Sequence, residues 1–142
     1  MSDPATGPGQ SVLTSGARSD SICVTRADLR NPAESDALVQ LLDAYARDPI
    51  GEGQGLCPST RRRLVPALRA FPGALVLLAW QAQCPVGLAV CFPSFSTFRA
   101  APVLNVHDLA VIPSARRLGV GSRLLAAIEE EGYTVTGSKT GD

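Results

Sequence analysis

The stretch from Leu104 to Ile128, which reads LNVHDLAVIPSARRLGVGSRLLAAI, decides the fold of this chain. It opens with an apolar segment, residues 104–111, whose length and composition predict a buried strand that Pro113 closes. A short loop with glycines follows, and from about Gly119 to Glu131 the apolar residues recur at helical spacing. We therefore expect a strand that leads through a loop directly into an amphipathic helix.

The loop before this helix has the chemistry of a phosphate-binding site. Arg116, Gly119 and Gly121 fit the pattern R-x-x-G-x-G. The first turn of a helix carries free N–H groups and the positive end of the dipole, and glycines let the backbone come close to phosphate oxygens. Arg116 and Arg117 add positive charge, and Ser122 adds a hydroxyl donor. We interpret the loop as a site for a pyrophosphate.

Two better-known phosphate motifs do not fit this loop. A P-loop requires a lysine directly after its second glycine, and no lysine follows Gly119 or Gly121. A dinucleotide fingerprint requires a third glycine, where this chain has Leu124. Neither a P-loop nor a Rossmann dinucleotide site is therefore expected.

The strand, loop and helix together resemble motif A of the GNAT superfamily of N-acetyltransferases, whose R-x-x-G-x-G/A loop holds the pyrophosphate of coenzyme A. The segment from Asp108 to Pro113 resembles the central strand of that family. The resemblance covers roughly Ser21 to Glu131. It implies an acetyl-CoA-dependent enzyme that acetylates a primary amine of a small molecule or protein, with acetyl-CoA as co-substrate and no metal.

The resemblance also implies site residues. Backbone groups of the family's central strand bind the pantetheine arm, and this role maps onto Leu109, Ala110 and Val111. The pyrophosphate would be surrounded by the loop and first helical turn, which comprise Arg116, Arg117, Leu118, Gly119, Val120, Gly121 and Ser122. The resemblance places the 51–55 loop near the acceptor entrance, where Glu52 would meet a cationic amine.

His107 and Asp108 are the candidate catalytic residues. His107 is the single histidine of the chain, and histidine side chains titrate near neutral pH, as a general base requires. In a regular strand His107 shares a face with Leu109 and Val111, while Asp108 points the other way unless a bulge intervenes. Some GNAT enzymes carry a histidine at the matching place. The alternative is that His107 is only a half-buried residue of the sheet.

The rest of the chain predicts further elements by the same periodicity. The expected elements are a strand at 21–26, a helix at 32–47, a helix at 59–70, strands at 75–80 and 86–92, and a loop at 93–102. Pro66 should either kink the second helix or mark its true start. The order is βααββ–βα, a mixed α/β fold with an α+β sheet. We expect a disordered tail at 1–20, a partial acetyltransferase domain at 21–131 and a polar tail at 132–142.

The composition excludes several other classes of protein. The 142 residues are 45% apolar, enough for one core. Lysine plus arginine equals aspartate plus glutamate at 13 each, which gives no reason to expect nucleic acid or a membrane surface as partner. The four cysteines form no C-x-x-C pair, so a zinc site is not expected and the thiols should be inert. No signal peptide is visible, and we expect a cytoplasmic protein.

The chain departs from the family after its last predicted helix. A complete GNAT domain continues with a strand, a helix and usually two closing strands, whereas here only Tyr133 to Thr136 can begin a strand. We expect a C-terminally truncated domain in which the strand 104–111 forms an open edge, its apolar side chains lack cover, and homodimers form through that edge. The alternative function is a catalytically inactive remnant that binds coenzyme A or acts as an interaction module.

Overall fold

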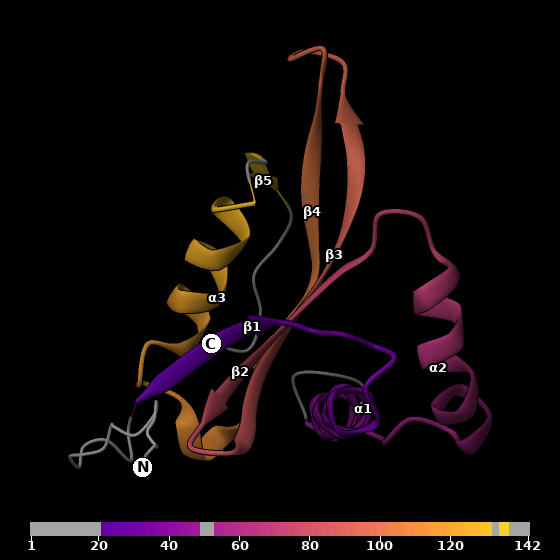
Figure 1. Ribbon diagram of the computed structural model, residues 1–142, viewed down its shortest axis with the longest axis vertical. Coiled ribbons are helices and arrows are strands. Elements are labelled where there is room, and N and C mark those ends of the chain that lie inside the picture. Colours follow the sequence, from indigo (N-terminus) through magenta and orange to yellow (C-terminus); the bar gives the residue numbers. More distant parts are fainter. Residues whose placement is uncertain (1–20, 49–52, 132–133, 137–142) are drawn as a thin grey trace, which may run out of the picture.

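The computed structural model describes residues 21–48, 53–131 and 134–136 (Figure 1). The elements are β1 (Ile22–Arg26), α1 (Pro32–Arg47), α2 (Pro58–Ala70), β2 (Leu75–Gln81), β3 (Cys84–Ser96), β4 (Ala101–Val111), a 3-10 turn (Pro113–Ala115), α3 (Val120–Glu129) and β5 (Thr134–Thr136). They form one sheet in the order β1-β2-β3-β4-β5. The first four strands pair antiparallel and β5 pairs parallel with β4. The predicted mixed α/β fold is confirmed. The expected tails at 1–20 and 132–142 lie outside the described residues, except for Thr134–Thr136, which form β5.

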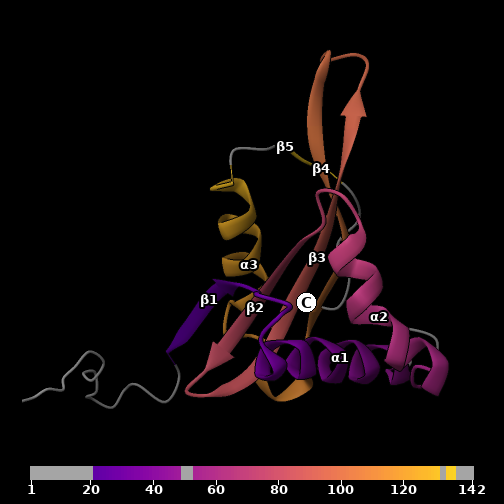
Figure 2. The ribbon, with the colours of Figure 1, turned by 45° about the vertical axis from the view of Figure 1, so that its right-hand side comes forward.

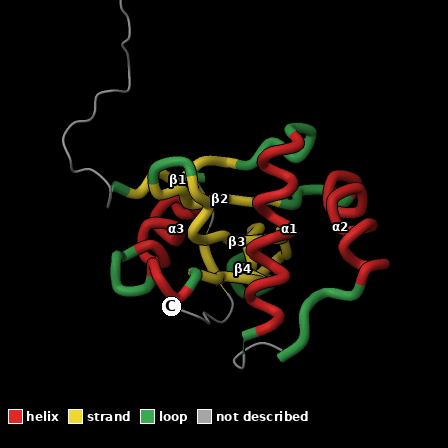
Figure 3. Tube along the Cα trace, turned by 90° about the horizontal axis from the view of Figure 1, so that it is seen from below, coloured by secondary structure: helices red, strands yellow, loops and turns green. Residues whose placement is uncertain are grey.

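The sheet separates two layers of helices. Helices α1 and α2 lie on one side of it and α3 lies on the other (Figure 3). Strand β2 is buried on both faces, because Leu77 packs toward α3 and Leu78 packs toward α1. This explains why its sequence is almost continuously apolar rather than alternating.

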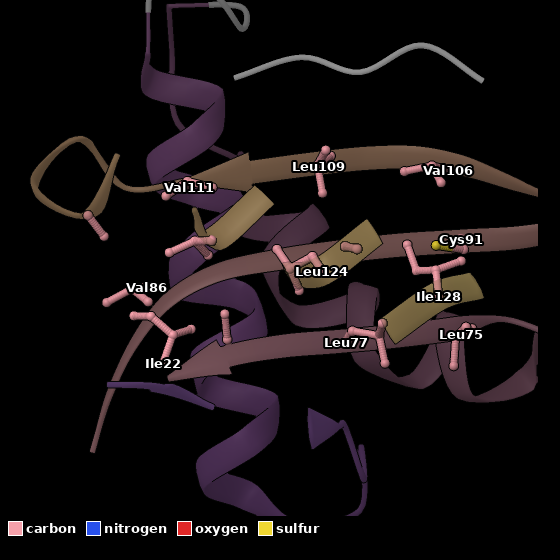
Figure 4. Packing of buried hydrophobic residues seen from close by; sticks show 14 of the residues in the cluster. Ile22, Leu75, Leu77, Val86, Cys91, Val106, Leu109, Val111, Leu124 and Ile128 are labelled. Atoms are coloured by element: carbon pink, nitrogen blue, oxygen red, sulfur yellow. The ribbon is translucent and has the colours of Figure 1, made fainter. Parts of the chain in front are cut away.

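Each side of the sheet has its own hydrophobic core. The core on the α3 side contains buried residues from every long strand (Figure 4), among them Ile22, Leu75, Leu77, Val86, Cys91, Leu104, Val106, Leu109, Val111, Val120, Leu124 and Ile128. The core on the α1 side is smaller and consists of Ala37, Leu38, Leu41, Leu68, Val76, Leu78, Leu88, Val90 and Ala110. Burial on two faces fixes the register of the sheet, because a one-residue slip would exchange the two sets.

The two N-terminal helices follow from local signals in the sequence. Helix α1 has the predicted bounds, and the Asn31 side chain caps it by accepting hydrogen bonds from the N–H groups of Ala33 and Glu34. Helix α2 begins at Pro58 and continues through Pro66, so Pro66 does not mark its start. The hydrogen bond that Pro66 cannot make would go to the carbonyl of Arg62, an exposed residue whose carbonyl water can reach. None of the described helices has both the length and the apolar composition needed to cross a membrane.

The loop expected at 93–102 is wrong. Strands β3 and β4 continue through it as a long hairpin that extends past the rest of the sheet (Figure 2), with Ser96 opposite Ala101. The prolines that suggested a loop are tolerated because β2 pairs with β3 only as far as Cys91. Beyond that point β3 has no second neighbour among the described strands, so Pro93 removes no hydrogen bond from the sheet interior.

The expectation of an open edge at strand 104–111 holds only for part of the strand, and the expectation that its apolar side chains lack cover is wrong. Residues Thr134–Thr136 pair with β4 at Val103–Asn105. The four apolar side chains that should have lacked cover, Leu104, Val106, Leu109 and Val111, are at most 4% exposed because they pack against α3. What stays unpaired, among the residues that the structure describes, is the backbone edge of β4 from 106 to 111.

Gly87 on β3 sets how closely α3 approaches the sheet. A Cβ atom at this position would lie 2.8 Å from Val120 Cγ1 and 3.2 Å from the carbonyl oxygen of Ala110. We predict that Gly87→Ala lowers the free energy of unfolding by about 1–3 kcal/mol, because the added methyl pushes α3 away from its core. Urea denaturation measures the loss.

A double variant tests this cause. Val120→Ala removes the side-chain atom that the new methyl would meet. The Gly87→Ala/Val120→Ala protein should therefore lose less stability than the sum of the two single variants. Simple additivity of the two losses would contradict the proposed clash.

Candidate active site

A bulge in β4 organises the residues that carry the chemistry. Val90 of β3 pairs with Asp108, whereas the next residue, Cys91, pairs with Val106. His107 is therefore an extra residue without a partner across the ladder, and the alternation of faces restarts after it. The expectation that His107 shares a face with Leu109 and Val111 is wrong for this reason.

The bulge places apolar side chains on one face and polar side chains on the other. Val106 before it and Leu109 after it both enter the core under α3. Asp108 instead lies on the same face as Ala110, which belongs to the core under α1. The two candidate catalytic residues consequently sit where β4 changes its alternation.

His107 lies on the side of α1 and α2. Its ring centroid is 5.7 Å from that of Phe92 in an edge-to-face arrangement, and Phe92 packs against the core on that side. Phe92 makes a second edge-to-face contact, at 5.0 Å, with Phe71 after α2. His107 itself is exposed, so its imidazole can exchange protons with water while the aromatic contact holds its ring.

Asp108 is half-buried beside it. Burial raises the pKa of the Asp108 carboxyl above its ordinary value of 3.8, and the neighbouring His107 opposes part of that rise. Among the described ion pairs none involves Asp108. The carboxylate is thus poorly solvated and is not neutralised by an arginine, which suits it to bind a cation from outside.

Asp108 lines a cavity of about 500 Å³ between α1 and α2. The walls come from both helices and from the segment that leads into α2, with Leu42, Tyr45, Leu56 and Leu64 as apolar residues and Gln54 and Thr60 as polar ones. The sequence predicted the helical spacing of several of these residues but gave no sign that they meet. Glu52, which was expected near the acceptor entrance, lies outside the described residues.

Asp43 fixes the geometry of this cavity from behind. Its carboxylate accepts a hydrogen bond from the Leu56 N–H at 2.8 Å and forms ion pairs with Arg47 at 2.8 Å and Arg61 at 3.0 Å. The hydrogen bond from Arg47 is the main cause that lowers the pKa of Asp43. One carboxylate therefore joins α1, the following segment and α2, and its charge is already satisfied.

Cys57 is the N-cap residue of α2 and also lines the cavity. The thiol is exposed, and its sulfur lies 3.2 Å from the Thr60 hydroxyl. Hydrogen bonds from Thr60 lower the pKa of the Cys57 thiol. The sequence alone did not indicate this contact, because it depends on where α2 begins. With Cys57 as the N-cap residue, Thr60 lies in the first turn of α2.

The predicted glycine loop leads into the first turn of α3. Gly119 is the N-cap residue with φ 78°, in the left-handed region that glycine adopts without strain. No side chain caps the helix and no acidic residue lies in its first turn. The first intrahelical bond runs from the Arg123 N–H to the Gly119 carbonyl, so the N–H groups of Val120, Gly121 and Ser122 have no intrahelical partner.

The two arginines of the loop are used differently. Arg116 turns inward, where its Nε donates to the Val111 carbonyl at 3.1 Å and its guanidinium pairs with Asp48 at 3.2 Å. It therefore ties the loop to the end of α1. Arg117 is exposed and has φ 74°, and Leu118 is 41% exposed. Only Arg117 leaves its charge facing outward from the loop.

The strand that leads into this loop offers backbone groups at its free edge. The Ile112 N–H bonds to the Val86 carbonyl of β3. Because bonding alternates along an antiparallel pair, Ala110 also directs its groups to β3, whereas Leu109 and Val111 direct theirs to the edge. The Val111 carbonyl is taken by Arg116. The Leu109 N–H and carbonyl and the Val111 N–H are left for a ligand along this edge.

No group of three or more His, Cys, Asp or Glu side chains able to hold a metal ion occurs in the part of the chain that the structure describes. The chemistry at hand is that of a carboxylate, an imidazole and a helix N-terminus around one strand. It can hold an anionic ligand on the edge of β4 and a cationic ligand on the face of β4.

Solved acetyltransferases share this fold. A GNAT family acetyltransferase from Staphylococcus aureus superposes with a TM-score of 0.66 at 20% identity, over 86% of this chain and 88% of that one. A ribosomal-protein-alanine N-acetyltransferase from Brucella melitensis gives a TM-score of 0.64 at 15% identity, with 84% and 81% covered. An aminoglycoside acetyltransferase from an uncultured soil metagenomic sample gives 0.63 at 19% identity, with 85% and 78% covered.

The sequence itself carries the family assignment. No curated protein sequence matches the chain. The model of the acetyltransferase (GNAT) family matches residues 37–138, which include most of α1 and the whole of β4, the glycine loop and α3. The chain therefore belongs to the GNAT family of acetyltransferases, and the reaction of its family is acetyl transfer.

Proposed function

We propose that this protein transfers the acetyl group of acetyl-CoA to a primary amine. The observation that carries the proposal is the uncapped first turn of α3 at the end of a strand edge, residues 106–111, that has no partner among the described strands. An anionic ligand with a long polar arm fits this combination, because the anion takes the helix N-terminus while the arm pairs with the strand. Acetyl-CoA has both parts.

The pyrophosphate is assigned to the loop and first turn of α3. The N–H groups of Val120, Gly121 and Ser122 would donate to its oxygens, and Gly119 keeps side-chain atoms out of their way. Arg117 would add the charge that faces outward. Arg116 acts differently from the sequence-based expectation: its side chain holds the loop in place, and its N–H already bonds to the Pro113 carbonyl.

The pantetheine arm is assigned to the free edge of β4. Leu109 and Val111 have backbone groups directed outward there. The backbone groups of Ala110, which was also expected to bind the arm, are directed to β3 instead. The same edge was expected to bind a second copy of the chain, and we assign it to the co-substrate instead. Following the edge from the loop toward β5, the arm would bring its thioester to the bulge.

The acceptor amine is assigned to the other side of β4. Asp108 lines the cavity between α1 and α2 and would pair with the ammonium form of the amine. His107, next to it in the bulge, would take the proton that the amine must lose. The amine lone pair then attacks the thioester carbonyl, and the C–N bond forms as the C–S bond breaks. The proton that the acetylated nitrogen loses goes to the departing thiolate, which leaves as the thiol of coenzyme A.

The alternative of an inactive remnant is not favoured. Strand β5 pairs with β4 at Val103–Asn105, beside the edge residues that we assign to the arm. The cavity, the bulge and the helix N-terminus all adjoin the same strand.

The pyrophosphate site can be tested without disturbing the fold. Ser122 is exposed in the first turn of α3. An acidic side chain there favours the helix by about 0.3–1 kcal/mol through the dipole, but it repels a phosphate. We predict that Ser122→Asp keeps the melting temperature while weakening acetyl-CoA binding by about tenfold or more in isothermal titration calorimetry. Ser122→Asn is the neutral control, and equal affinity in the Asp variant and the parent would show that the site is elsewhere.

The two catalytic candidates should affect different kinetic constants. His107→Ala is expected to lower kcat by about 100-fold or more with little change in the acceptor KM, as for a lost general base. Asp108→Asn is expected to raise the acceptor KM by about tenfold or more, because the ammonium loses its counter-ion. Asp36→Asn, an exposed change of the same kind on α1, is the control. Unchanged rates in the His107 variant would remove it from the mechanism.

The Asp108 carboxylate should also lower the stability of the folded protein near neutral pH. Its pKa is raised in the folded state, so its contribution to stability is present below the unfolded value of 3.8 and is lost as the pH rises through the folded value. We predict that Asp108→Asn is more stable than the parent near neutral pH and that the advantage shrinks toward about pH 4. Urea denaturation at both pH values measures it, and an advantage independent of pH would rule out the carboxylate charge as its source.

A further inference from the structure

We propose that the acceptor is a small primary amine with one ammonium group and an apolar substituent, bound in the cavity between α1 and α2. This inference rests on the proposed acetyl transfer and adds the chemical class of the acceptor. It follows from the size, the charge and the wall of that cavity.

The size of the cavity favours a small molecule. Its volume of about 500 Å³ falls within the range of about 300–1,000 Å³ typical of small-molecule sites. The Asp43 hub holds the walls together through Arg47, Arg61 and the Leu56 N–H, so the cavity is a built feature rather than a gap between loose helices. A compact amine can enter such a site whole.

The charge of the cavity favours a single ammonium group. Among the described residues that line it, Asp108 is the one carboxylate. Asp43 adds none, because two arginines already neutralise it. A second ammonium group in the ligand would find no second carboxylate among the described lining residues, and an unpaired charge out of water is costly.

The wall of the cavity favours an apolar substituent. Leu42, Tyr45, Leu56 and Leu64 all line it, and all four are only half-buried in the protein itself. An apolar group that covers them removes their remaining surface from water. Polar groups are fewer, with Gln54 and Thr60 able to orient a ligand.

The first test compares amines as acceptors. Acetylated products are measured by mass spectrometry with phenethylamine and hexylamine as apolar monoamines and with spermidine and an aminoglycoside as polycations. We expect kcat/KM for the monoamines to exceed that for the polycations by about tenfold or more, because the extra charges stay unpaired. Acetylation that favours the polycations would overturn this inference while leaving the proposed acetyl transfer intact.

The second test detects binding without catalysis. Cys57 lies in the cavity wall and its thiol is exposed, whereas Cys84, also exposed, lies at the start of β3 and is not among the residues that line the cavity. The rate at which iodoacetamide alkylates each thiol is followed by peptide mapping. Phenethylamine should slow alkylation of Cys57 by about threefold or more and leave Cys84 unchanged, and spermidine at the same concentration should protect neither.

A variant links this protection to Asp108. In the Asp108→Asn protein the amine should no longer slow alkylation of Cys57, judged by the ratio of the rates with and without amine in that same variant. Protection by spermidine equal to that by phenethylamine, or no protection of Cys57 by any monoamine at millimolar concentration, would overturn the inference. If protection occurs as expected but no amine is acetylated, the proposed acetyl transfer fails and the amine site stands.

Discussion

The one extra residue at His107 is the constraint on which the rest of the site depends. Without the bulge, Asp108 and Leu109 would exchange faces, and a carboxylate would enter the core under α3. With it, both halves of β4 keep their apolar side chains toward α3, and the two polar residues meet on the other face. The bulge therefore allows one strand to bury its apolar side chains under α3 and to present His107 and Asp108 on the other face.

Strand β4 also determines how the two ligands would approach each other. Its edge leads into the loop and α3, whereas the face that carries Asp108 lies on the side of α1 and α2. Arg116 is the side chain that connects the two sides, since it binds both the end of β4 and Asp48 at the end of α1. The position of the loop relative to the cavity is thus fixed by a partly buried ion pair as well as by packing, and both ligands would share one rigid strand.

The helices and the glycine loop could be predicted from the sequence because local signals determine them. Periodicity and the Asn31 cap give α1 its bounds, and the glycine pattern locates the loop and α3. The hairpin at 93–102 was missed because its prolines are acceptable only when a neighbouring strand has already ended, which is a tertiary fact. The bulge, the inward turn of Arg116 and the cavity likewise depend on contacts between distant segments, and periodicity carries no record of them.

The division of the core into two clusters has a consequence for how such a protein changes over generations. Residues that shape the acceptor cavity pack with α1 and α2, and residues that support the loop pack with α3, so few side chains belong to both sets. Mutations more than a few contacts apart act almost independently. Changes in α1 and α2 can therefore alter the proposed acceptor cavity without altering the proposed donor site, and a mutant library confined to those helices should retain that donor site in most of its members.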